Sequence, residues 1–214
     1  MSEDKFRIRP FQAGDEIAAN HVCMKTGDNG ADGEPFFRED PDALGRIYVE
    51  PYLKFEPELA LMLEDSGGVC GYALGALDSK AFFQRYEGEW RPQLVLGFPE
   101  PRGDSGDWTR IQQAYHLYHH PDYFCPEPYS QYPSHIHIDL LPRAQGKGFG
   151  RKMIEQILAE LRKTSTPGVH LGMSVLNPTA YGFYCKLGFK ELARDGQGDE
   201  EAIYLGMIFK NPDD

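Results

Sequence analysis

The sequence predicts an α/β fold (α+β) with a mixed, mostly antiparallel sheet flanked by helices, and three observations carry this prediction. Several segments alternate apolar and polar residues, which is the period-two pattern of half-buried strands. Residues 148–163 place apolar side chains three and four positions apart, as an amphipathic helix requires. Two apolar runs flank residues 64–68, whose acidic residues and glycines are typical of a β-hairpin turn.

The first 77 residues predict strands and helices in a definite order. Alternation marks the strands, helical spacing marks the helices, and a stretch rich in Gly, Asp and Pro marks a loop. In order they are a strand over 6–11, a helix over 13–24, a loop over 27–42, a helix over 42–52, and hairpin strands over 59–63 and 69–77.

Residues 79–134 predict an ordered insertion. The segment begins with KAFFQRYEGEW, which favours a helix, and then fills with proline, glycine and aromatic residues. A second helix is expected near residues 109–118.

The regular pattern returns at His135. Residues 135–141 (HIHIDLL) predict a strand with His135, His137 and Asp139 on one face. Residues 169–175 alternate as well, and a helix starts at Asn177-Pro178 and ends at Gly188, which suits a C-cap. Final strands are expected over 190–193 and 202–209.

Length and charge limit the classes of function. The 214 residues are expected to form one domain, 1–214, and the net charge of −11 argues against nucleic-acid and anionic-membrane partners. No apolar run reaches the roughly 20 residues of a membrane span. The start, MSEDKFRIRP, lacks the apolar segment of a signal peptide. Because the four cysteines are scattered, we expect free thiols in the cytoplasm.

The segment that carries most chemistry is 140–150, LLPRAQGKGFG. A strand ends at Pro142, and a glycine loop leads into the amphipathic helix, whose N-terminus offers unpaired N–H groups to a phosphate. Residues 145–163 hold five basic and two acidic side chains, a local charge of +3. A P-loop would need Ser or Thr after Lys147, and a dinucleotide fingerprint would need glycine at Arg151, so neither fits. An ordinary strand-to-helix turn remains the alternative.

Two motifs together resemble the GNAT acetyltransferase family. Gln145-x-x-Gly148-x-Gly150 resembles its acetyl-CoA signature, and residues 177–189 (NPTAYGFYCKLGF) resemble its later motif. The resemblance covers most of the chain outside the insertion. It implies a GNAT fold in which strands 135–141 and 169–175 splay apart and hold the pantetheine arm of acetyl-CoA between them.

A narrower resemblance is to the acetyltransferase-like C-terminal domain of animal O-GlcNAcases. The residues that carry it are 25–33, 51–78, 134–141 and 183–189. The resemblance implies direct transfer of acetyl from acetyl-CoA to an amine, on a small molecule or a protein lysine. The alternative is a non-catalytic acyl-CoA-binding or protein-interaction module, and a homodimer is left open. Hydrolysis of O-GlcNAc is not expected of these residues.

The resemblance also implies roles for individual residues. Tyr184 is expected to be the acid that protonates the leaving sulfur, and Asp139 the base that accepts the amine proton. His135 and His137 are rival bases, and each of these side chains can equally be structural. The expected acetyl-CoA contacts are backbone groups of Leu140, Leu141, Gln145, Gly146, Gly148, Phe149 and Gly150, the Asn177 amide, and the cations Lys147, Arg151 and Lys186.

Two further patterns are less specific. His116, His119, His120, Asp122 and Cys125 suit zinc by type, but their spacing matches no closed zinc site, so no metal is expected. Residues 1–65 hold 15 acidic and 7 basic side chains, an excess that either steers a cationic amine or is only a solvated surface.

Overall fold

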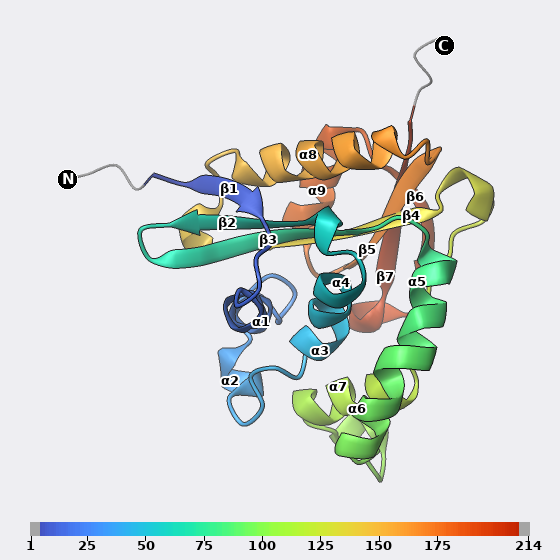
Figure 1. Ribbon diagram of the computed structural model, residues 1–214. Coiled ribbons are helices and arrows are strands. Elements are labelled where there is room, and N and C mark those ends of the chain that lie inside the picture. The colour runs from blue at the N-terminus through green and yellow to red at the C-terminus, as the bar shows by residue number, and fades with distance from the viewer. Residues whose placement is uncertain (1–4, 210–214) are drawn as a thin grey trace.

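The computed structural model describes residues 5–209, and within them seven strands form one sheet in the order β1-β2-β3-β4-β5-β7-β6 (Figure 1). All neighbours pair antiparallel except β4 and β5, which run parallel. The strands are β1 (Arg7–Pro10), β2 (Ala60–Asp65), β3 (Gly68–Ala76), β4 (Ser134–Leu140), β5 (Gly168–Ser174), β6 (Lys190–Asp195) and β7 (Ala202–Ile208). This confirms the predicted fold class. The ends of the predicted 1–214 domain lie outside the described residues.

Helices cover both faces of the sheet, as Figure 1 shows. One face carries α1 (Glu16–Lys25), α2 (Glu34–Phe37), α3 (Gly45–Tyr48) and α4 (Glu50–Phe55), and the other carries α8 (Phe149–Lys163) and α9 (Pro178–Leu187). At one end of the sheet lies α5 (Ser79–Arg85), and beyond the α1–α4 layer lie α6 (Arg91–Gly97) and α7 (Arg110–His119).

Prolines explain two departures from the predicted helices. The single helix expected over 42–52 is divided at Val49, because Pro51 has no N–H with which to continue the ladder of α3 and instead opens α4. The loop expected over 27–42 contains α2, which likewise has proline in its first turn. Both differences are local.

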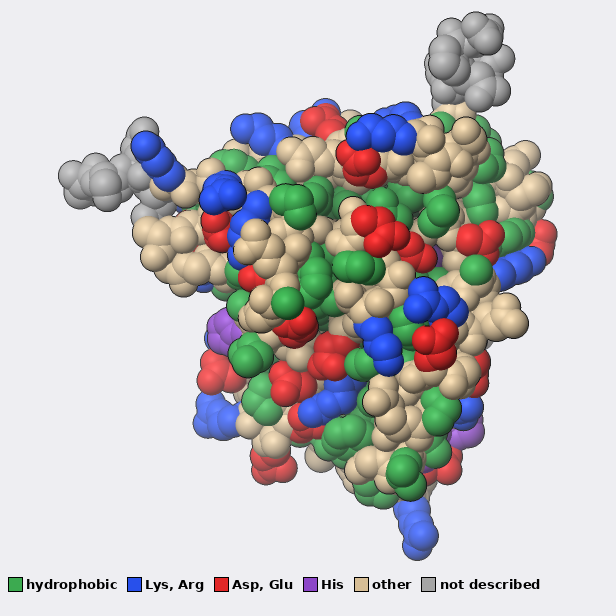
Figure 2. Space-filling view, viewed as in Figure 1, with side chains coloured by type: hydrophobic (Ala, Val, Ile, Leu, Met, Phe, Trp, Pro, Cys, Tyr) green, Lys and Arg blue, Asp and Glu red, His purple; other side chains and the backbone are tan. Residues whose placement is uncertain are grey.

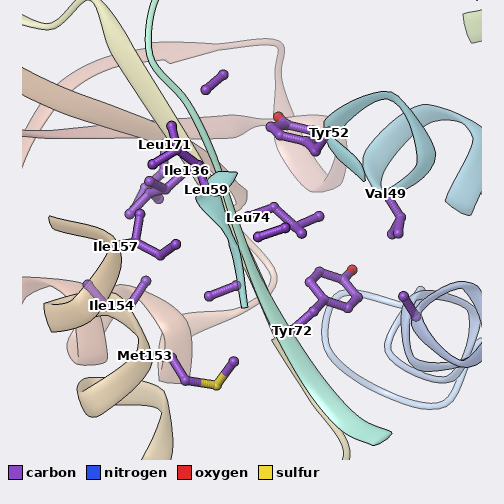
Figure 3. Close-up of a cluster of buried hydrophobic side chains, with 14 of the residues drawn as sticks. Val49, Tyr52, Leu59, Tyr72, Leu74, Ile136, Met153, Ile154, Ile157 and Leu171 are labelled. Atoms are coloured by element: carbon purple, nitrogen blue, oxygen red, sulfur yellow. The ribbon is translucent and has the colours of Figure 1, made fainter. Parts of the chain in front are cut away.

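The core lies on both faces of the sheet. The predicted apolar stripe of α8 is buried: Met153, Ile154, Ile157, Leu158 and Leu161. Figure 3 shows Met153, Ile154 and Ile157 on one side of the strands and Val49, Tyr52 and Tyr72 on the other. The α8 stripe and the α1–α4 layer therefore fix the sheet from opposite faces.

The insertion is helical at both predicted places. α5 continues through a single π-helical turn, Tyr86–Trp90, into α6, and α7 starts at a capping box of Thr109 and Gln112. The chain then returns over β5 and β7: His170 Nδ1 lies 2.8 Å from the Tyr132 carbonyl, and Phe124 stacks on Tyr204 with ring centroids 3.4 Å apart. This return covers part of the sheet face that carries His135.

Candidate active site

The sheet opens between its two central strands. β4 and β5 are paired only at Ser134↔Val169 and His135↔His170. Farther along, residues 137–140 of β4 and 171–174 of β5 have no ladder between them within the described residues, and we call this opening the seam. The structure therefore contains the splayed pair of strands that the family resemblance implied.

Ladder alternation decides which backbone groups face the seam. Leu141 N–H donates to the Cys70 carbonyl at 2.8 Å, so in the antiparallel β3–β4 pair the odd residues of β4 bond to β3. The N–H and C=O groups of Ile138 and Leu140 consequently point at the seam. On β5, Val175 N–H donates to Glu201, which by the same alternation turns Gly172 and Ser174 toward the seam.

Leu140 and Leu141 were both predicted to contact the cofactor through their backbones, but their backbone groups point in different directions. The N–H of Leu141 is used by β3, which speaks against its predicted contact with the cofactor. The carbonyl of Leu140 accepts a 2.7 Å hydrogen bond from Gln145 Nε2. Of the predicted pair, the N–H of Leu140 is thus the group directed into the seam.

The glycine loop lies where the seam meets α8. Gly146 and Gly148 have φ of 70° and 81°, a left-handed conformation that favours glycine. Gly148 is the N-cap of α8 and has no side-chain capping bond, so the first N–H groups of a 15-residue helix are left for a ligand. A Cβ on Gly150 would lie 3.2 Å from Leu140 Cδ1, so this glycine lets α8 approach β4 closely.

The predicted cations divide into two groups. Arg151 Nη2 reaches the carbonyl of Lys186 at 3.4 Å, so both lie where the start of α8 meets the end of α9. Lys147 instead lies with its Nζ 4.4 Å from the centroid of the Phe6 ring, which also packs on Phe149. Arg151 therefore lies beside the end of α9, whereas the Lys147 side chain lies beside Phe6, the residue before β1.

Asp139 is held by a buried tyrosine. Tyr72, from the adjacent residue of β3, donates to Asp139 Oδ2 at 2.5 Å, and its hydroxyl also lies 3.0 Å from His137 Nε2. His137 Nε2 is 3.2 Å from the same carboxylate oxygen. Burial and the negative charge of Asp139 raise the pKa of Tyr72 well above its usual value, so it remains a proton donor. Sequence reasoning missed Tyr72, although the β3–β4 register would have placed it beside Asp139.

Tyr184 lies on α9 and is only 7% exposed. Burial raises the pKa of its phenol, and the negative charge of Asp139 raises it further. Tyr184 therefore keeps its proton at neutral pH.

His135 belongs to the core. Ser79 Oγ donates to the Pro133 carbonyl at 2.8 Å, so His135 Nδ1 must donate to Ser79 Oγ at 2.7 Å. Its ring stacks on Phe83, and burial depresses its pKa well below the usual value. It lies four residues before Asp139, about 13 Å along a strand. This packing speaks against His135 as the base.

Asn177 is the N-cap of α9, a structural role that the sequence analysis did not assign to it. Its Oδ1 accepts from Ala180 N–H at 3.0 Å and caps α9. Its Nδ2 would be 2.6 Å from a Cβ on Gly30. The loop after α1 therefore contacts the start of α9, and Asn177 has only part of its amide left for a ligand.

The acidic residues of the first 65 positions are largely paired. Lys25 bridges Asp32 and Glu34, Arg46 contacts Asp40, and Arg9 contacts both Asp15 and Glu64. Figure 2 likewise shows acidic and basic side chains interspersed on the visible face. The solvated surface, one of the two interpretations left open, fits this arrangement better.

The candidate zinc residues of the insertion do not gather as one set. His119 Nε2 faces the Phe98 carbonyl at 2.9 Å, and Asp122 lies 3.4 Å from the Tyr204 hydroxyl. His116 and His120 do meet, together with Glu100, which the sequence did not indicate.

Across residues 5–209, none of the helices combines the length and apolarity that crossing a bilayer demands.

Comparison with known proteins identifies the family. The family model for the acetyltransferase (GNAT) domain matches residues 95–191. The crystal structure of SsHAT is 35% identical to this chain, covers 95% of it and 98% of its own length, and superposes with a TM-score of 0.84. The chain belongs to the GNAT acetyltransferase family. The family prediction made from the two motifs is confirmed.

Two more distant relatives extend the comparison. Protein O-GlcNAcase of Rattus norvegicus is 26% identical over 202 residues, which are 94% of this chain and 22% of that protein. This GNAT chain thus spans about a fifth of the length of the curated relatives it matches. A putative acetyltransferase from Salmonella typhimurium, solved with its cofactor acetyl-CoA, shares the fold at a TM-score of 0.53 and 15% identity over 95% of this chain and 93% of its own.

Proposed function

We propose that this GNAT protein is an acetyl-CoA-dependent N-acetyltransferase that transfers acetyl directly to an amine, on a small molecule or a protein lysine. The observation that carries the proposal is the seam: an unpaired strand edge that leads into the glycine loop and lies beside Asp139 and Tyr184. A chain that only bound acyl-CoA would have no need of a carboxylate and a protonated phenol at the same place.

The seam and the glycine loop fit the two ends of acetyl-CoA. The pantetheine arm would take the place of a strand and bond to the inward backbone edge of Ile138 and Leu140. Its pyrophosphate would accept from N–H groups of residues 145–150 at the N-terminus of α8, with Arg151 and Lys186 adding positive charge. Acetyl-CoA supplies the thioester, and the protein supplies the donors around it.

The proposed chemistry needs one base and one acid. Asp139 accepts a proton from the acceptor amine, whose nitrogen then forms the amide bond to the acetyl carbon. A backbone N–H on the open edge of β4 donates to the carbonyl oxygen as negative charge develops there. The carbon–sulfur bond breaks, and Tyr184 donates its proton to the leaving sulfur. The products are the acetylated amine and CoA thiol, and solvent returns the protons.

Tyr72 and His137 position the base. Tyr72 is fully buried and cannot swing away, so its hydrogen bond fixes the position of Asp139 Oδ2. His137 is partly exposed and touches the same oxygen, which gives the accepted proton a short route to solvent.

In the same proposal the protein acts in the cytoplasm, since its four cysteines are all free thiols.

Release of CoA thiol tests the proposal. The protein is incubated with acetyl-CoA and a panel of polyamines, aminoglycosides and lysine peptides, and free thiol is titrated. We expect amine-dependent release that Asp139→Asn reduces strongly. Tight binding of acetyl-CoA with no release above background for any amine would contradict catalysis and favour the non-catalytic binding module.

A further inference from the structure

A second cluster of ligating side chains lies in the insertion, away from the seam. His116 and His120 are four residues apart at the end of α7, and their rings lie 4.5 Å apart between centroids. Glu100, from the loop after α6, places Oε1 2.6 Å from His120 Nε2. One ligand atom from each of the three residues lies within 4.8 Å of the other two.

The three side chains have the donor types of a zinc site. Two imidazole nitrogens and one carboxylate oxygen are ligands that Zn²⁺ binds at about 2.0–2.2 Å. His116 in α7 and its C-cap residue His120 already hold their rings side by side, 4.5 Å apart between centroids, so little conformational freedom is lost when they chelate one ion. Small rotations of the exposed Glu100 and His120 side chains would bring the ligand atoms to bonding distance.

A second observation concerns His116 itself. Its Nδ1 is buried and has no hydrogen-bond partner among the described residues. Buried polar atoms in folded proteins are nearly always paired, and an unpaired one often marks an ion or water. Trp108 packs against the ring, with centroids 4.9 Å apart, and limits its movement.

We propose that Glu100, His116 and His120 form a Zn²⁺ site with a water molecule at the fourth position. The ion ties the loop after α6 to the end of α7. Its coordination replaces the hydrogen bond between His120 and Glu100 with two bonds to the metal. The site would stabilise the fold of the insertion and takes no part in acetyl transfer, so it is independent of the function proposed above.

Calorimetry with zinc chloride alone tests this site. We expect one equivalent of Zn²⁺ to bind the wild-type protein with a dissociation constant on the order of micromolar. His120→Ala and Glu100→Gln should each weaken the binding at least tenfold. His21→Ala removes an exposed helical histidine elsewhere and should leave the affinity unchanged. Absence of binding, or equal affinity in wild type and His120→Ala, would overturn the proposal.

A spectroscopic readout keeps the test decisive if a variant folds poorly. Co²⁺ added to the wild-type protein should give the intense visible absorption of a tetrahedral site, and one equivalent of Zn²⁺ should remove it. Weak octahedral absorption that Zn²⁺ does not change would contradict a site built from these three residues.

Discussion

The two ends of β4 differ in pairing and burial, although their side chains alternate in the same way. At the start of the strand, His135 lies opposite His170 in the paired part of β4 and β5 and is buried against Ser79 and Phe83. Two residues later, His137 lies on the same face but beyond the last β5 pair, is partly exposed, and contacts the carboxylate of Asp139. Where β4 is paired with β5, its histidine is part of the core. Where this pairing has ended, its side chains are partly exposed and can be reached by a ligand.

This difference shows that strand alternation alone does not locate a site. Alternation correctly put His135, His137 and Asp139 on one face, but only the end of the β4–β5 ladder distinguishes the core histidine His135 from His137, which contacts the carboxylate of Asp139.

The largest effect is expected at the glycine loop. Gly148→Trp puts a bulky side chain on a residue with φ of 81°, beside the N–H groups that would bind pyrophosphate, and should weaken acetyl-CoA binding at least 100-fold. Calorimetry measures the affinity. Gly14→Trp is the matched control, because Gly14 has φ of 103° and open space around it, away from the loop. Unchanged affinity in folded Gly148→Trp would reject the pyrophosphate site.

Asp139→Asn should separate chemistry from binding. The amide keeps the size of the side chain but cannot accept the amine proton, so turnover at neutral pH should fall about 100-fold while acetyl-CoA affinity stays nearly constant. The loss should shrink as pH rises and more free amine is present. A pH–rate profile that superimposes on that of the wild type would remove Asp139 as the base and favour His137.

Tyr184→Phe should lower turnover about tenfold or more, which corresponds to about 1.4 kcal/mol of activation free energy. Only a hydroxyl is lost, so calorimetry should find the acetyl-CoA affinity unaltered. Steady-state rates with an accepted amine check the prediction. An unchanged rate would mean that another group protonates the sulfur.

The two histidines should respond in opposite ways. His135→Gln is expected to cost about 1–3 kcal/mol of unfolding free energy, because Ser79 and the packed ring lose their partner, whereas His137→Gln should mainly lower turnover. Because the folded-state pKa of His135 is depressed, its neutral form stabilises the fold above about pH 6.5, and this contribution is lost as pH falls below that value. Urea titrations at pH 7.5 and 5.5 should show a smaller pH dependence in His135→Gln than in the wild type; equal dependence would contradict this assignment.

The smallest effect is expected at Glu56, far from the boundary on β4. Burial, followed by the charge of Glu58, raises the pKa of Glu56 to about 7. The folded state therefore prefers the protonated form, and its stabilising contribution is lost as pH rises from about 4.5 through 7. Glu56→Gln should be more stable than wild type by about 1 kcal/mol at pH 8, since the half-buried site is screened by solvent, and about equal near pH 5. Urea titration measures the difference.

The sequence predicted the strands and long helices well because their signals are local. The alternation of HIHIDLL and the apolar stripe of α8 are properties of neighbouring residues. It could not predict contacts that depend on strand register, such as Tyr72 with Asp139 or Cys70 with Leu141. It also treated His135 and His137 as equivalents, since their difference arises from residues 79–83, more than 50 positions earlier in the chain.

Amide exchange at β4 tests the central claim most directly. In the seam, the N–H of Leu140 is free to bond to acetyl-CoA, whereas the N–H of Leu141 already bonds to Cys70. NMR-detected hydrogen exchange should therefore show that acetyl-CoA slows exchange at Ile138 and Leu140 at least tenfold and leaves Leu141 and His135 nearly unchanged. If saturating acetyl-CoA slowed exchange equally along the whole strand, or not at all at Leu140, the seam would not be the binding site.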